Sequence, residues 1–175
     1  MKKANQAAYL PVIGATEYIS VGKYNKVPAK IDTGAESSAI WASKIEVDKD
    51  GTLKFVLFDK KSPLYNGHIF KRAKGTYKVG VIRSSNGHEQ IRYRVYLPIK
   101  IGEKKIRILV SLADRSKNVF PVLVGRRTVA GKFLVDTAIK KINETPKDLR
   151  KERIELNDEL EKDPYQFYQK HVKTK

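Results

Sequence analysis

The strongest constraint on the fold is a succession of short strand-like segments, separated by turn residues, from residue 9 to residue 142. Apolar and polar residues alternate within most of them, and Gly22, Asn86-Gly87 and Gly102 stand at turns between them. Short strands at this spacing are typical of a β-sandwich or a barrel. We therefore predict an all-β domain, and a chain of 175 residues is long enough to bury its core.

Strands are expected over residues 9–21, 26–34, 52–58, 76–82, 90–101, 104–113 and 119–127. The last, VFPVLVGRR, carries an unbroken apolar run that predicts a buried strand. Helix signal before residue 142 is scarce. The short segments SSAIWASKI (37–45) and RRTVAG (126–131) are the two candidates.

The chain changes character at residue 143. Thr145 is a suitable N-cap and Pro146 suits the first helical position, so a charged helix is predicted over 146–162. The segment after it, PYQFYQKHVKTK, carries three aromatic residues and is expected to dock on the body of the protein or on a partner. These patterns predict two parts, a β domain over 1–142 and a helical charged tail over 143–175.

The formal net charge of +17 lies entirely in the β domain, because residues 143–175 carry eight basic and eight acidic residues. A basic body attracts polyanions such as acidic peptides, nucleic acid or the ribosome. No apolar stretch approaches the roughly 20 residues that cross a bilayer, and Pro11 and Glu17 interrupt the only N-terminal run resembling a signal peptide. We expect a cytoplasmic protein without membrane contact.

Several enzyme classes find no support in the sequence. The three histidines are not spaced as metal ligands, there is no cysteine, and no H-E-x-x-H pattern occurs. A G-x-S-x-G elbow and a glycine-rich phosphate loop are also missing. We therefore expect neither a metal nor a cofactor.

Asp32-Thr33-Gly34 is the candidate for catalytic chemistry, since it follows the apolar strand ending at Ile31. Two carboxylates at hydrogen-bond distance share one proton, so one acts as base toward a water and the other polarises a carbonyl. Gly34 would let a substrate backbone approach, Ala35 would keep the loop compact, and the Thr33 hydroxyl would lock the loop onto neighbouring backbone.

A second element makes the motif more specific. Val122-Leu123-Val124-Gly125-Arg126 predicts a buried strand behind the Asp32 loop, with Gly125 where the two chains cross.

The segments AKIDTGAESSAIWA (29–42), VIRSSNG (81–87) and LADRSKNVFPVLVGR (112–126) occur in the order found in the retropepsin-like aspartic peptidases. The chain resembles most closely the bacterial branch that carries the name ATP-dependent zinc protease, which is linked to the ligase that adds glutamates to a ribosomal protein. The resemblance covers about 9–142 and implies a closed acid-protease barrel, an aspartic endopeptidase and Asp32 as its catalytic residue. Asp114-Arg115 matches the family's D-R, with no role assigned to it.

The chain has one D-T-G, whereas the chemistry needs two carboxylates. The resemblance implies a homodimer in which each copy contributes one Asp32. The alternative second carboxylate is Asp136 in FLVDTA (133–138), where Ala138 replaces the needed glycine. We favour FLVDTA as the C-terminal strand, at a dimer interface.

The resemblance also implies that Arg126 pairs with the acidic residue after D-T-G-A, here Glu36. A flap should cover the substrate. The preferred tip is Tyr65-Asn66-Gly67-His68 in the basic loop 60–75, and the alternative tip is 85–87. A basic flap would favour acidic substrates.

Three functional hypotheses follow. The first is a homodimeric aspartic endopeptidase acting on peptides or proteins, with a preference for acidic ones. The second is a non-catalytic retropepsin-like domain that binds an acidic protein or a nucleic acid. The third is a basic nucleic-acid module, for which Tyr93 and Tyr96 among basic residues give some support.

Overall fold

The computed structural model describes residues 9–83, 89–142 and 147–173. The chain divides into two compact units, Met1–Ile142 and Asn143–Lys175. We call the first the barrel unit and the second the helical unit.

The strands and the short helix of the barrel unit are, in chain order, β1 (Val12–Val21), β2 (Tyr24–Asp32), β3 (Ser38–Val47), β4 (Leu53–Leu57), β5 (Ile69–Arg72), β6 (Lys78–Arg83), β7 (Glu89–Ile101), β8 (Lys104–Ala113), β9 (Val122–Gly125), α1 (Arg126–Val129) and β10 (Leu134–Lys140).

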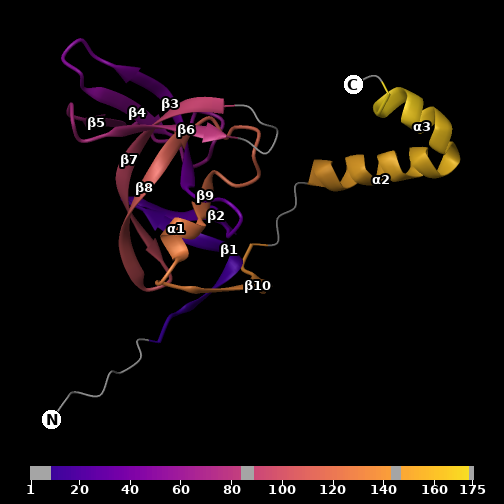
Figure 1. The fold of residues 1–175 in the computed structure, drawn as a ribbon, viewed down its shortest axis with the longest axis horizontal. Coiled ribbons are helices and arrows are strands. Elements are labelled where there is room, and N and C mark those ends of the chain that lie inside the picture. The colour runs from indigo at the N-terminus through magenta and orange to yellow at the C-terminus, as the bar shows by residue number, and fades with distance from the viewer. Residues whose placement is uncertain (1–8, 84–88, 143–146, 174–175) are drawn as a thin grey trace. The chain divides into compact units, whose positions relative to one another are not determined.

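Six strands close into a barrel in the order β1-β2-β9-β3-β8-β7, because β7 pairs back onto β1 through Ile19 and Ile101. Strand β10 adds to β1 in parallel, β6 extends from β7, and β4 and β5 extend from β3 (Figure 1). The predicted all-β class and the closed barrel are confirmed.

Alternation along the strands builds the core. In β7, Val95, Leu97, Ile99 and Ile101 are buried and alternate with outward-facing residues. They meet the buried residues of the other barrel strands in one hydrophobic cluster. Burial of these apolar side chains is the main stabilising contribution in such a domain.

One helix prediction is wrong and one is confirmed. Residues 38–45 of this segment lie in β3, not in a helix. This strand is central, between β8 and β9, and Ala39, Ile40 and Trp41 are buried in succession, as is usual for a strand covered on both faces. Sheet pairing therefore overrides the local helix preference of its small residues. The segment that follows Gly125 does form α1.

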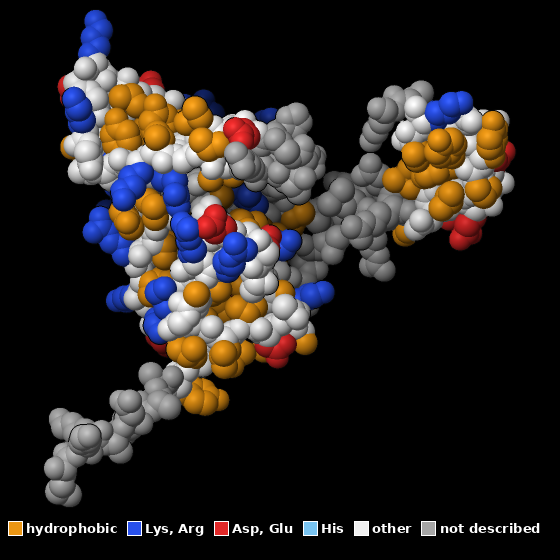
Figure 2. Space-filling view, viewed as in Figure 1, with side chains coloured by type: hydrophobic (Ala, Val, Ile, Leu, Met, Phe, Trp, Pro, Cys, Tyr) orange, Lys and Arg blue, Asp and Glu red, His pale blue; other side chains and the backbone are white. Residues whose placement is uncertain are grey.

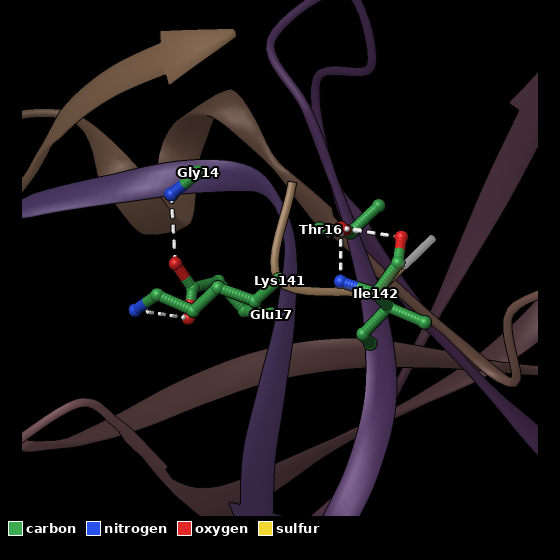
Figure 3. A network of polar contacts seen from close by, with 5 residues as sticks. All are labelled: Gly14, Thr16, Glu17, Lys141 and Ile142. Atoms are coloured by element: carbon green, nitrogen blue, oxygen red, sulfur yellow. Dashed lines mark hydrogen bonds and ion pairs between the residues drawn. The ribbon is translucent and has the colours of Figure 1, made fainter. Parts of the chain in front are cut away.

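The end of the barrel unit is fastened to β1 by polar contacts (Figure 3). The Thr16 hydroxyl donates to the Ile142 carbonyl and accepts from the Ile142 amide, at 3.1 and 3.0 Å. The buried Glu17 carboxylate accepts from the Gly14 amide at 2.7 Å and pairs with Lys141 at 2.9 Å. We call this group of residues the β1 anchor.

The helical unit contains α2 (Lys147–Lys162) and α3 (Pro164–His171). The predicted charged helix is therefore present, whereas its predicted start at Thr145-Pro146 lies outside the described residues. Asp163 caps α3, since its Oδ1 accepts from the amides of Tyr165 and Gln166. In the described part of the chain, no helix has the length and apolar content needed to span a bilayer.

Candidate functional site

Asp32 ends β2 and is held by its own loop. Its Oδ1 accepts hydrogen bonds from the Gly34 and Ala35 amides, both at 3.1 Å. Its Oδ2 lies 3.9 Å from Lys30 Nζ, and the Asp32 side chain is 30% exposed. One oxygen is thus fixed by backbone donors while the carboxylate as a whole stays accessible.

Strand β9 supports this loop from behind. Asp32 is the partner of Gly125 in the parallel pair β2–β9. A Cβ on Gly125 would lie 2.6 Å from the carbonyl carbon and oxygen of Ser37, so only glycine fits at this crossing. The Gly125 amide donates to Ser38 Oγ at 3.0 Å, which ties β9 to the start of β3. The structure therefore brings together the two sequence elements that we predicted to meet.

The prediction that Glu36 forms an ion pair with Arg126 is wrong about the basic residue. Glu36 pairs with Arg127, at 2.6 Å between Oε1 and Nη2. Arg126 Nη1 instead donates to the Gly34 carbonyl at 3.2 Å. Gly125 is followed by the first turn of α1, so the two neighbouring arginines project differently, and both contact the Asp32 loop.

Thr33 differs from expectation too. Its side chain is exposed, and within the described residues its hydroxyl makes no hydrogen bond. The loop is locked instead by Asp32 Oδ1 and by the Arg126 amide, which donates to the Ala35 carbonyl at 2.8 Å.

A cleft of about 1130 Å³ opens beside Asp32. Its walls come from the Asp32 loop, from the β6–β7 hairpin and from the loop after β8. The lining residues are Asp32, Gly34, Ala35, Glu36, Ser37, Ala39, Val81, Ile82, Glu89, Gln90, Arg92, Ser111, Arg115, Asn118 and Leu123.

The flap prediction at 65–68 is wrong in its location. Asn66 Oδ1 accepts from the hydroxyl of Tyr24, the first residue of β2 and thus the end opposite Asp32. Asn66, Gly67 and His68 line a separate cavity of about 590 Å³. The β6–β7 hairpin borders the Asp32 cleft instead, and the alternative flap tip at 85–87, which connects these strands, lies outside the described residues.

Two guanidinium groups in the cleft were not singled out as site residues by the sequence. Burial lowers the pKa of Arg115, the neighbouring charge of Arg92 lowers it further, and Asp32 acts in the opposite direction. Burial also lowers the pKa of Arg92. The available signal was the Asp114-Arg115 pair in the third motif. Asp114 forms a turn by accepting from the Ser116 amide at 2.9 Å, and that hydrogen bond lowers the pKa of Asp114.

Asp136 lies on β10, opposite Gly14 of β1. Its Oδ1 accepts from the Ala138 amide at 2.9 Å, as Asp32 Oδ1 accepts from the amide two residues on. Strand β1 lies between β10 and β2, however, and two strand spacings amount to roughly 10 Å. The two carboxylates are not hydrogen-bonded to each other, and residues 134–138 of FLVDTA lie in β10, the C-terminal strand of the barrel unit.

No cluster of three or more histidine or acidic side chains suited to a metal occurs within ranges 9–83, 89–142 and 147–173. Figure 2 shows Lys and Arg side chains spread over the visible face of the barrel unit, interleaved with hydrophobic side chains and with few Asp and Glu. The excess positive charge is thus at the surface.

The chain is similar in sequence to parts of longer curated proteins. The chain is 24% identical over 132 residues to a probable alpha-L-glutamate ligase of Desulfotalea psychrophila and 27% identical over 129 residues to one of Shewanella pealeana. The matches cover 74% and 71% of this chain but only 28% of each relative. The chain thus spans little more than a quarter of the curated relatives that it matches.

A crystal structure of a protein of unknown function from Legionella pneumophila is also similar. The match has a TM-score of 0.57 and 28% sequence identity, and it covers 74% of this chain and 95% of that one. A family model described as the retropepsin-like aspartic endopeptidase RimB matches residues 12–146, well over half of the chain. This protein therefore belongs to the RimB-like family of retropepsin-like aspartic endopeptidases.

Proposed function

We propose that the protein is an aspartic endopeptidase that works as a homodimer. Each copy contributes Asp32, and the two carboxylates share one proton across a twofold axis. The ionised carboxylate takes a proton from a bound water, which attacks the scissile carbonyl carbon. The protonated carboxyl donates a hydrogen bond to the carbonyl oxygen as the tetrahedral intermediate forms.

The observation that carries this proposal is the fixed, accessible carboxylate of Asp32. Backbone amides hold Oδ1, and the side chain borders a cleft large enough for a peptide. Gly34 and the Thr33 side chain are exposed beside it, which leaves room for the loop of a second copy. In the described part of the chain no other carboxylate is hydrogen-bonded to Asp32, which supports a dyad completed by a second chain.

The direct test compares the wild type with Asp32→Asn on a mixed, acid-rich peptide library between pH 4 and 8. We expect cleavage by the wild type and none by Asp32→Asn, because the amide cannot serve as base. Mass spectrometry identifies the products, and analytical ultracentrifugation checks that the variant keeps its dimer. Cleavage that survives in Asp32→Asn would refute the mechanism.

The second candidate is a non-catalytic domain that binds an acidic protein. It is favoured by the names of the curated relatives, which describe glutamate ligases rather than peptidases. Under this hypothesis neither chain cleaves any peptide and Asp32→Asn leaves binding unchanged. The same pair of samples, tested for binding to an immobilised acidic peptide, separates the two candidates.

A further inference from the structure

The cleft floor is a row of residues that are neighbours across the sheet. Ser111 of β8 is paired with Ala39 of β3, and Ala39 is paired with Leu123 of β9. Paired residues on adjacent strands point to the same side. All three line the Asp32 cleft. Arg94 of β7 is the partner of Ser111 on its other side.

Ser111 has an unused hydroxyl. Its side chain is 1% exposed, and its Oγ has no hydrogen-bond partner among the described residues. A buried hydroxyl without a partner is unfavourable by about 1–3 kcal/mol, so such groups need a reason. Arg94 Nε is likewise unpartnered within the described ranges, but it is outside the cleft lining and its side chain crosses Gly80.

Arg92 and Arg115 also have hydrogen-bond donors that pair with no described residue. Arg92 Nε donates to Gln90 at 2.8 Å and Arg115 Nε donates to the Phe120 carbonyl at 3.1 Å. These bonds orient both groups by Nε and leave their terminal nitrogens available. Of the ion pairs between described residues, none includes either arginine.

Two of the acidic residues that line the cleft are engaged by other groups. Glu36 pairs with Arg127, and Asp32 is bound by backbone amides. Glu89 lies at the start of β7 and lines the cleft. Burial lowers the pKa of Arg115 most, and the charge of Arg92 lowers it further, as expected for two like charges close together.

We propose that Arg92, Arg115 and Ser111 form a carboxylate subsite in the Asp32 cleft, which holds an acidic side chain of the substrate peptide. The inference rests on the proposed peptidase function and names the residues that determine its specificity. A carboxylate can accept from two guanidinium groups and one hydroxyl at once, which would satisfy the buried Ser111 Oγ.

The sheet register places the subsite within reach of a bound peptide. Strands β9 and β3 lie between β2 and β8, so Ser111 is about three strand spacings, or roughly 14 Å, from the strand of Asp32. An extended peptide advances about 3.3 Å per residue. The acidic side chain should therefore stand a few residues away from the scissile bond.

The test uses pairs of peptides that differ by one Glu or Gln, with this residue moved along the sequence. For the wild type, we expect kcat/KM to be higher with Glu at one or two positions away from the scissile bond. Arg92→Gln and Arg115→Gln should each lower kcat/KM for the Glu peptide by roughly tenfold or more, and for the Gln peptide by less than about twofold. Ser111→Ala should weaken the same preference by about two- to fivefold.

Two controls exclude trivial causes. Arg107→Gln makes the same charge change on the outward face of β8, beside Tyr96, and should leave the preference intact. Arg115→Lys keeps the charge but not the fork-shaped donor, so it should restore part of the preference. Equal losses on Glu and Gln peptides in Arg92→Gln and Arg115→Gln would overturn the inference.

Failure of the peptidase proposal remains distinguishable. If the wild type cleaves nothing, the same Glu and Gln peptides are labelled and their Kd values are measured by fluorescence anisotropy. A Glu preference that Arg92→Gln and Arg115→Gln abolish supports the subsite without catalysis. A Kd that is the same for both peptides refutes it, whatever the activity.

Discussion

Single residues make the Asp32 site, and the smallest one is the least replaceable. Gly125 has φ −81° and ψ 168°, which any residue adopts. A glycine is therefore needed at this position for steric rather than conformational reasons. The atoms that a Cβ would meet are the backbone carbon and oxygen of Ser37, which belong to the Asp32 side of the crossing and cannot rotate away. The packing of two backbones thus fixes the loop that holds the carboxylate.

Gly125→Ala is therefore expected to destabilise the protein by about 2–3 kcal/mol, the upper part of the range for overpacking. Urea unfolding of the purified chain measures this loss. Gly80→Ala is the matched control: its Cβ would lie 2.9 Å from Arg94 Cδ, a flexible atom that can move, so a loss below about 1 kcal/mol is expected. Equal losses in the two variants would mean that the contact between Gly125 and the backbone of Ser37 is not the rigid element described above.

The sequence predicted those strands and loops whose structure depends on residues close together in the chain. The Asp32 turn, the buried β9 strand and the glycine between them follow from short motifs, because each depends on neighbours in the sequence or on one strand pair. The flap and the cleft depend on the barrel register. Strand β7 is 13 residues long and pairs with both β8 and β1, which carries its first half to Asp32. No local sequence pattern encodes this approach of β7 to Asp32.

Local patterns failed for a second reason where two similar residues compete. Arg126 and Arg127 both follow Gly125, and only the turn of α1 decides which one reaches Glu36. Ser111 and Arg92 were missed because a serine or an arginine on an alternating strand is the usual outward-facing residue. Their position in the lining of the Asp32 cleft makes them exceptional, and this position depends on the tertiary fold.

The β1 anchor connects β10 to the barrel and gives a test of its own. Lys141→Met removes the only charged partner that the described residues offer to the Glu17 carboxylate, which is 2% exposed. We expect a loss of about 1–3 kcal/mol in the free energy of unfolding, less than for a fully buried pair because Lys141 is half exposed. Lys140→Met, a neighbour without an ion pair in the described part of the chain, should change it by less than about 0.5 kcal/mol.

Glu17→Gln in the Lys141→Met background should recover part of that loss, because the amide is neutral and still accepts from the Gly14 amide. The double-mutant cycle gives the coupling energy between the two side chains. Strict additivity would show that Lys141 acts through its alkyl chain rather than through its charge.

For the assembled protein, the basic surface and the proposed dimer act against each other. The +17 charge belongs to residues 1–142, so two barrel units repel each other when they associate. Salt screens that repulsion over about 8–10 Å at physiological ionic strength. A carboxylate pair at the proposed twofold axis would place two acidic groups where two basic bodies meet, and an acidic substrate in the cleft would add to this compensation.

A dyad shared between two chains predicts that an inactive chain abolishes the activity of the wild-type chain with which it pairs. Asp32→Asn folds with the same loop, since the side-chain oxygen still accepts from the Gly34 and Ala35 amides. If copies exchange freely, mixing it with an equal amount of wild type should reduce activity per wild-type chain to about half, and a tenfold excess should reduce it to about a tenth. Native mass spectrometry of a mass-tagged variant verifies the exchange.

Asp136→Asn, mixed in the same proportions, should leave the activity per chain unchanged, because β1 separates Asp136 from Asp32. Wild-type activity that persists in demonstrated heterodimers would mean that one chain supplies both carboxylates, and the dimeric mechanism would fail.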